Sequence, residues 1–324
     1  MNKLQIIGHE IQREALLGLC RAQKLSHSLM FVGPAGIGKT LVAKEVSAAL
    51  VCEKSKEQLG ACGKCKNCHL FVSENYPDFY PIDCTNKDVS SVKAIRELIS
   101  TLQLKSFTGG ARIVIFNDAE KLHPAASNAL LKTLEEPLKN TYFFIIIENS
   151  GKLPLTVASR CHKWCFDSLK KDELLSVANS LCKDVTAEIL EKAVTFLDGG
   201  VSNLITTIES LDLAITIEKL VSKIILGDLK AAIDLAGMVH SEKELVEVSL
   251  SFIRHSVRNE MRIAKHNTEK SQLSKLLLDL IEAERVIFER NLNSFYVLNV
   301  VLTQFVANKN GFSGQRSLLS ETMI

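Results

Sequence analysis

The sequence lacks three features that would assign the protein to a class at once. It has little net charge, since 39 Lys and Arg residues stand against 37 Asp and Glu residues for a formal total of +2. Charge alone therefore does not indicate a nucleic-acid partner. It has no apolar run of about 18 residues, the length that a transmembrane helix needs. The segment Met1–Glu10 also lacks the basic stretch followed by an apolar core that is typical of a signal peptide. These absences predict no membrane partner and favour a cytoplasmic protein.

Length and cysteine content set two further limits. A chain of 324 residues is too long for one ordinary core, so two or three domains are expected. Nine cysteines in a protein with these features are expected as free thiols or metal ligands rather than as disulfides.

A glycine-rich segment follows the apolar run Ser28–Val32 and precedes a helical pattern. It matches GxxxxGK[ST] at every position. Backbone N–H groups of such a loop cradle phosphates, Lys39 reaches the outer phosphates, and the Thr40 hydroxyl holds Mg²⁺. The positive end of the following helix adds to this. A purely structural turn is the alternative, but the strand–loop–helix context predicts an ATP or ADP site with these residues: Gly33, Pro34, Ala35, Gly36, Ile37, Gly38, Lys39 and Thr40.

Four cysteines follow this helix in the pattern C-x9-C-x2-C-x2-C: Cys52, Cys62, Cys65 and Cys68. Four thiolates suit a tetrahedral metal, and Gly63 permits the tight turn that aims two sulfurs at one ion. The pattern predicts structural zinc, because nothing supplies an open coordination position beside an acid or base. An iron–sulfur cluster, whose usual cysteine–proline is absent here, and unliganded thiols are the alternatives.

The buried run Ala111–Phe116 predicts a strand, and Asn117-Asp118-Ala119-Glu120 follows it. An aspartate at the carboxyl end of a central strand is where a phosphate-loop ATPase holds Mg²⁺, so Asp118 is the candidate ligand. Large ATPase families commonly place a glutamate directly after that aspartate to orient water. Ala119 occupies that position, and Glu120 on a strand would point to the other face. We therefore expect nucleotide binding with weak or absent hydrolysis.

A longer run downstream, together with Leu153-Pro154 and Ser159-Arg160-Cys161, resembles the bacterial clamp-loader branch of the AAA+ ATPases, the family of DNA polymerase III δ′ and γ/τ subunits. The matching motifs span Ile7–Cys161, about half of the chain. The run reads Pro124-Ala125-Ala126-Ser127-Asn128-Ala129-Leu130-Leu131-Lys132-Thr133-Leu134-Glu135-Glu136-Pro137.

The resemblance implies an α/β fold, with an AAA+ phosphate-loop NTPase domain built on a parallel sheet. This domain would cover residues 1–166 and include the zinc module at 52–68. A small helical lid domain would follow at 167–212, and an all-α collar domain for oligomerisation at 213–324. Beyond Trp164 the sequence matches the family only in its helical pattern.

The resemblance also implies roles for single residues. Arg160 would act as an arginine finger on the ATP of a neighbouring subunit, since a planar guanidinium suits the spread charge of phosphoryl transfer. A local salt bridge is the alternative. The first sensor would fall at Glu148 or Asn149, and the second near Ser202, with no arginine between Lys192 and Lys219. The missing glutamate and missing second-sensor arginine favour a δ′-type member.

The family implies a role in the DNA polymerase III holoenzyme, as a stator that helps to load the sliding clamp onto primed DNA. Its partners would be the γ/τ and δ subunits, with clamp and DNA reached through the assembled complex. An ATP-hydrolysing motor of the γ/τ type is the main alternative, disfavoured by Ala119 and by the lack of a long extension after the collar. A phosphate-loop kinase that acts on a small molecule is the second alternative function.

Overall fold

The computed structural model describes residues 6–311 except 137, 150, 152, 198 and 242–244. The chain forms two compact units. The first comprises Met1–Val177 with Gly199–Ser202, and the second comprises Ala178–Asp198 with Asn203–Ile324. Among the described residues, no helix combines the length and the apolar character that crossing a membrane requires.

The first unit is built on a five-stranded sheet in the order β2-β3-β4-β1-β5, and every neighbouring pair is parallel. Parallel pairing brings the carboxyl ends of all the strands to one edge, where α/β proteins bind their ligands. The register sets Val32 beside Ile147 and Phe116 beside Ile145. The strands are β1 Ser28–Val32, β2 Phe79–Asp83, β3 Arg112–Asn117, β4 Thr141–Ile147 and β5 His162–Cys165.

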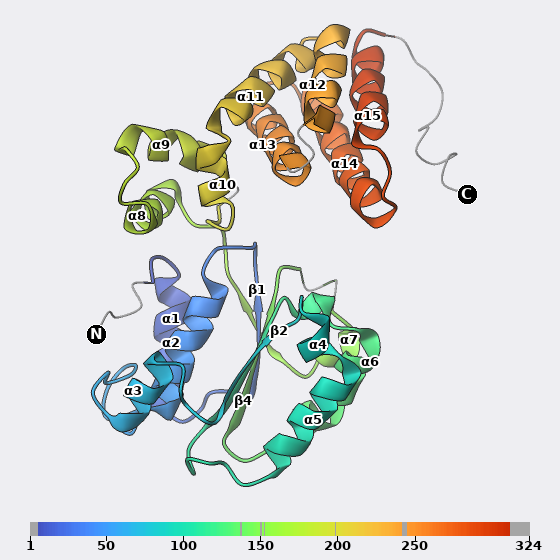
Figure 1. The fold of residues 1–324 in the computed structure, drawn as a ribbon. Coiled ribbons are helices and arrows are strands. Elements are labelled where there is room, and N and C mark those ends of the chain that lie inside the picture. Colours follow the sequence, from blue (N-terminus) through green and yellow to red (C-terminus); the bar gives the residue numbers. More distant parts are fainter. Residues whose placement is uncertain are drawn as a thin grey trace. The chain divides into compact units, whose positions relative to one another are not determined.

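Helices cover both faces of this sheet (Figure 1). On one face lie α1 Glu10–Arg21, α2 Lys39–Val51 and α3 Lys66–Val72, and on the other lie α4 Lys87–Ser90, α5 Val92–Gln103, α6 Pro124–Glu135 and α7 Leu155–Ala158. Strands covered on both faces need apolar side chains throughout, which explains the continuous run in β3. Within β3, Val114 and Phe116 pack with Ile95 of α5 and Leu130 of α6.

The predicted α/β fold is therefore confirmed. Helices α4 and α5 are separate, because the backbone of Ser91 between them is extended. The Ser91 hydroxyl accepts a hydrogen bond from the N–H of Ala94 at 3.2 Å. Serine favours this capping role, and the cap ends the first helix and begins the second.

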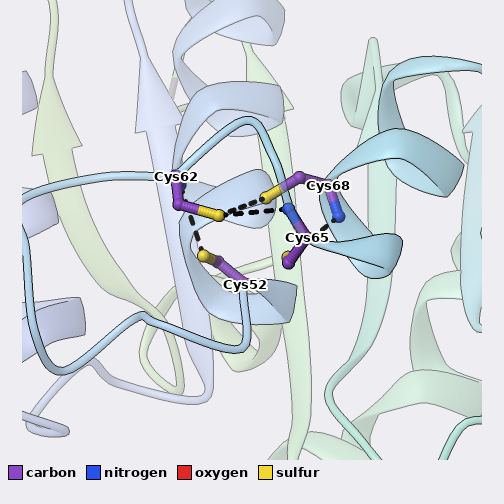
Figure 2. A group of neighbouring side chains, drawn as sticks. All are labelled: Cys52, Cys62, Cys65 and Cys68. Atoms are coloured by element: carbon purple, nitrogen blue, oxygen red, sulfur yellow. Dashed lines mark hydrogen bonds between the residues drawn. The ribbon is translucent and has the colours of Figure 1, made fainter.

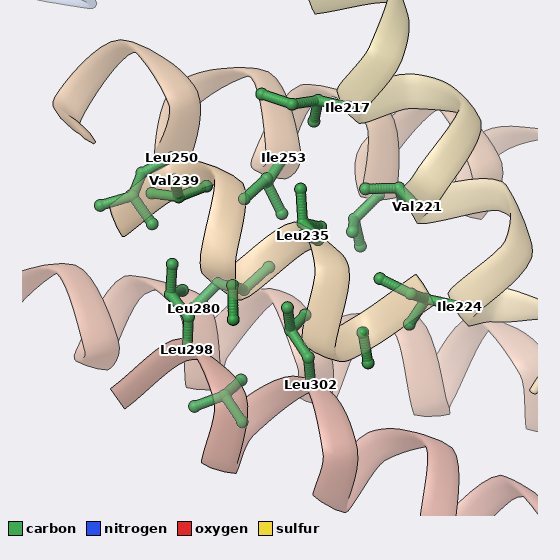
Figure 3. Packing of buried hydrophobic residues seen from close by; sticks show 14 of the residues in the cluster. Ile217, Val221, Ile224, Leu235, Val239, Leu250, Ile253, Leu280, Leu298 and Leu302 are labelled. Carbon is green, nitrogen blue, oxygen red and sulfur yellow. The ribbon is translucent and has the colours of Figure 1, made fainter. Parts of the chain in front are cut away.

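The second unit is helical. Its helices are α9 Ala187–Thr195, α10 Leu204–Glu209, α11 Leu211–Ile225, α12 Leu229–Ser241, α13 Val246–Ile263, α14 Asn267–Glu289 and α15 Ser294–Lys309, while α8 Lys171–Leu181 spans the division between the units. Side chains from helices α11 to α15 converge in one core (Figure 3), with Ile217 from α11, Leu235 from α12, Ile253 from α13, Leu280 from α14 and Leu298 from α15.

The apolar stripe of α14 is divided between core and surface. Leu273, Leu276 and Leu280 are buried in the core, whereas Ile281 and Phe288 are exposed. Packing in the core of the helical unit thus explains most of the apolar residues on this face of α14.

The boundaries of the two units differ from the three predicted domains, 1–166, 167–212 and 213–324. The difference concerns the predicted lid domain. Helices α9 and α10 cluster with the helical unit, while Gly199–Ser202 cluster with the sheet unit. The physical reason is a backbone contact, since the N–H of Val201 donates to the carbonyl of Gly36 at 3.0 Å. The three-domain division stays a prediction.

Candidate nucleotide and metal sites

The glycine-rich segment Gly33–Thr40, here called the phosphate loop, connects the end of β1 to the start of α2. Gly38 begins the helix as its N-cap with φ 97°, and Gly36 has φ 68°. Glycine adopts these left-handed values at little cost. A Cβ atom on Gly36 would also lie 2.2 Å from the Ser202 hydroxyl. The loop can therefore turn tightly into a helix N-terminus, as phosphate binding requires.

Lys39 is folded back onto this loop. Its side chain is buried, and its Nζ donates to the carbonyls of Gly33 and Pro34, each at 2.5 Å. Burial lowers the pKa of Lys39, while the negative charges of Glu148, Glu120 and Asp118 act in the opposite direction. The ammonium thus has only neutral hydrogen-bond acceptors on the loop, and a phosphate would be a stronger, charged acceptor.

A cavity of about 390 Å³ opens beside the phosphate loop, a volume within the range of small-molecule sites. Its lining combines polar and apolar side chains, and a nucleotide with charged phosphates and a flat base needs both. The polar side chains are Lys39, Thr40, Asn117, Asp118 and Glu148, and the apolar ones are Ile6, Ile7, Ile37, Leu41, Ile146, Leu169, Val177 and Val201.

Thr40 is joined to a residue that sequence reasoning missed. Its hydroxyl donates to Oδ1 of Asn117, the last residue of β3, at 2.8 Å. The predicted magnesium ligand Asp118 lines the same cavity from a left-handed turn with φ 51°. Asn117 lacks the carboxylate expected of a magnesium ligand, although its place at the end of a strand is visible in the sequence. The role of Asp118 stays a prediction.

Glu120 does not lie on a strand. Residues Ala119–Lys121 form a short 3₁₀ helix, η1, so the two-residue alternation of a strand does not apply. Oε1 of Glu120 instead accepts a hydrogen bond from the backbone N–H of Glu148 at 3.0 Å. Its other carboxylate oxygen is buried without a partner among the described residues. Glu120 therefore links the ends of β3 and β4.

The two expected sensor positions lie beside the cavity or the loop. Glu148 follows β4 directly and lines the cavity, so a carboxylate stands at the first of these positions. Ser202 lies against Gly36 of the phosphate loop. Among the described residues around Ser202, the side chain that approaches the phosphate loop therefore ends in a hydroxyl, not in the guanidinium of a second-sensor arginine.

Arg160 follows α7 and makes a local ion pair. Its Nε donates to Oε1 of Glu135 at 2.7 Å, and its Nη2 contacts the same oxygen. Its Nη1 donates to the carbonyl of Thr156 at 2.7 Å. The local salt bridge that the sequence left open is therefore present, and any role at a neighbour's nucleotide belongs to the proposals below.

The four predicted cysteine ligands converge on one point (Figure 2). Cys52 follows the last residue of α2, Cys62 lies in the loop, Cys65 caps the start of α3, and Cys68 lies within α3. Their Sγ atoms all lie within 4.8 Å of one another. A zinc ion with Zn–S bonds of about 2.3 Å needs sulfurs about 3.8 Å apart, so a small contraction would suffice.

Backbone N–H groups point at these sulfurs. The Cys62 sulfur receives those of Lys64 at 3.4 Å and Cys65 at 3.3 Å, and the Cys52 sulfur receives that of Cys62 at 3.3 Å. The two donors at Cys62 lower the pKa of that thiol to about 6. Such donors stabilise thiolates, the form that binds metal. Burial acts in the opposite direction and raises the pKa of Cys52 and of Cys68. The donor set fits zinc as a structural cross-link between α2 and α3.

The fold and the site define a phosphate-loop domain of AAA+ type followed by a helical unit. Residues 8–170, about half of the chain, match the family model described as DNA polymerase III, delta subunit. The chain belongs to this family, which places it among the clamp-loader AAA+ proteins of DNA polymerase III.

Three relatives illustrate the similarity. The DNA polymerase III subunit delta′ of Pseudomonas aeruginosa is 35% identical over 44% of this chain and 43% of its own length. The DNA polymerase III subunit gamma/tau of Mycoplasma genitalium is 26% identical over 96% and 48%. Protein STICHEL of Arabidopsis thaliana is 28% identical over 90% and 24%. The chain thus spans between about a quarter and a half of the length of these relatives.

Lys39→Ala should weaken binding of ATP or ADP about 10- to 100-fold, because charged hydrogen bonds contribute about 1.5–3 kcal/mol. Titration with a fluorescent nucleotide analogue measures this. Lys44→Ala is the matched control, since Lys44 lies on the same helix and pairs with Glu74. Equal affinity of wild type and Lys39→Ala would show that the loop does not bind phosphates in this way.

The purified protein should contain about one zinc ion per chain, and Cys65→Ser should lose it and lower the thermal stability of the first unit, since ligation energy is folding energy. Elemental analysis and thermal unfolding measure these effects. Cys165→Ser, an exposed cysteine outside the cluster, is the control. A native protein free of zinc, with all four thiols open to titration, would contradict the prediction.

Proposed function

We propose that the chain is a δ′-type clamp-loader subunit of the DNA polymerase III holoenzyme. It binds ATP or ADP with Mg²⁺, hydrolyses ATP poorly, and acts as a stator for a neighbouring motor subunit. The observation that carries this proposal is the hydrogen bond from Thr40 to Asn117, a neutral residue, at the point where the magnesium ion of a phosphate-loop ATPase is held.

The charges of the cavity support poor hydrolysis. Mg²⁺ prefers carboxylate and other oxygen ligands, and the amide oxygen of Asn117 carries no negative charge to balance the ion. Glu148 and Asp118 line the same cavity and would repel a γ-phosphate that is not fully neutralised. The buried Lys39 is the cation that offsets them within the loop.

In the stator role, the residue that takes part in the neighbour's phosphoryl transfer is Arg160. In the proposed assembly this guanidinium reaches the nucleotide of an adjacent γ/τ-type subunit and stabilises the charge that spreads over the transferred phosphoryl group. The partners would be γ/τ and δ subunits, with the sliding clamp and primed DNA reached through the complex in the cytoplasm. Zinc at the four cysteines would have a structural role only.

A second candidate is an ATP-hydrolysing motor of the γ/τ type. Two observations favour it: the gamma/tau relative aligns over 96% of this chain, and Asp118 supplies a carboxylate to the cavity directly after Asn117. In that case Asp118, the predicted magnesium ligand, would also activate water.

The isolated chain should hydrolyse ATP at a rate close to background, because neither Ala119 nor Asn117 supplies a carboxylate. Steady-state phosphate release measures this, with Lys39→Ala as the blank for a contaminating ATPase. A robust activity that Lys39→Ala abolishes would favour the motor. Asp118→Asn would then show whether that carboxylate performs the hydrolysis.

Arg160→Ala should leave nucleotide binding by this chain intact and depress the clamp- and DNA-stimulated ATPase of the assembled loader. Arginine fingers in GTPase systems contribute roughly 10³- to 10⁵-fold in rate, but only one site of the assembly adjoins this chain. The total ATPase rate of the assembly should therefore fall by less than this factor. The rate of clamp loading should fall by more than the ATPase rate does.

Arg160→Lys should restore little, because a flexible ammonium does not reproduce the planar fork of guanidinium donors. Both variants need confirmed incorporation into the assembly. Normal ATPase and normal clamp loading with incorporated Arg160→Ala would make Arg160 a structural residue.

A further inference from the structure

The carboxylate that holds Arg160 comes from the last residue of α6, Glu135. Both Nε and Nη2 of Arg160 contact one oxygen of this carboxylate, and Nη1 is bonded to Thr156 and lies 3.3 Å from the Ser159 hydroxyl. All three nitrogens of the guanidinium are therefore engaged within the chain. A phosphate on a neighbouring subunit would have to displace at least one of these partners.

The backbones behind this pair are fixed, while the pair itself is accessible. Leu134 beside Glu135 and Val157 in α7 are buried in the same apolar core. The side chains of Arg160 and Glu135 are 33% and 48% exposed. The core thus sets where the two groups meet, and solvent access allows the guanidinium to leave without movement of α6 or α7.

Helix stability does not explain a glutamate at this position. The carboxyl end of a helix carries partial negative charge, so a carboxylate there is unfavourable and a cation is favourable. Glu135 adds a negative charge at this end of α6, and Arg160 contacts α6 through that carboxylate. The carboxylate is therefore best explained by what it does to Arg160.

We propose that Glu135 is a positioning residue that holds Arg160 on its own subunit until the phosphates of a neighbour's nucleotide displace it. This inference rests on the proposed role of Arg160 as an arginine finger. A triphosphate competes well, because it presents several charged oxygens that accept bidentate hydrogen bonds from a guanidinium. A diphosphate lacks the γ-phosphate, so Arg160 returns to Glu135 after hydrolysis.

The first test uses the isolated chain and the reactivity of Arg160 toward phenylglyoxal, followed by peptide mass analysis. Glu135→Gln keeps the shape of the side chain and removes its charge, and should raise the modification rate of Arg160 about two- to fivefold, the scale of an exposed ion pair. Glu136→Gln removes the neighbouring exposed charge, is the matched control, and should change nothing. Equal rates in all three proteins would overturn the proposal.

The second test uses the assembled loader with wild-type partners. Glu135→Gln should raise ATPase at subsaturating ATP about two- to fivefold and strengthen inhibition by ADP, and salt should reduce both differences by screening the pair. In the double variant with Arg160→Ala, the effect of Glu135→Gln should vanish. Loss of activity in Glu135→Gln equal to that of Arg160→Ala would make the pair structural and overturn the proposal.

The two proposals fail in different ways. If Arg160→Ala has no effect on the assembly, the finger role is wrong, whatever Glu135 does. If Arg160→Ala depresses the ATPase while Glu135→Gln behaves as Glu136→Gln does, the finger role stands and the holding role of Glu135 is wrong.

Discussion

The parallel pairing of β3, β4 and β1 is the constraint on which the site depends. Because these strands run in the same direction, their last residues meet at one edge of the sheet. This edge brings the phosphate loop after β1, Asn117 at the end of β3 and Glu148 after β4 to a single cavity. Three segments distant in sequence thereby share one electrostatic environment around Lys39, and the charge of any one of them changes what the others can bind.

Local spacing was enough to predict the features that depend on neighbouring residues. The glycines before Lys39 and the four cysteines from Cys52 to Cys68 specify their geometry within a few turns of chain, and the structure brings each group together. The apolar run of β3 predicted a buried strand for the same reason, since its pattern reflects cover on both faces. The α/β fold as a whole was predicted instead from the resemblance of a longer run of residues, 124–137, to the clamp-loader family.

Side-chain partners across the fold could not be predicted in this way. Glu120 was expected on a strand, yet a left-handed turn at Asp118 starts a 3₁₀ helix that aims it at Glu148. Asn117 reaches Thr40 although β4 lies between β3 and β1 in the sheet. The pair of Glu135 with Arg160 depends on how α6 packs against α7. Each contact joins residues whose distance is set by tertiary packing, which no short pattern records.

Helix α2 connects the two candidate sites mechanically. It begins at Lys39, directly after the phosphate loop, and ends at Val51, directly before Cys52. Thirteen residues of helix span about 20 Å, and a regular helix without proline transmits a shift along its axis with little bending. A metal at the four cysteines would hold the carboxyl end of this helix against α3, so that the position of its amino end, where Lys39 and Thr40 meet phosphate, is set from both sides. The phosphate loop and the four-cysteine cluster are therefore joined through the two ends of one helix.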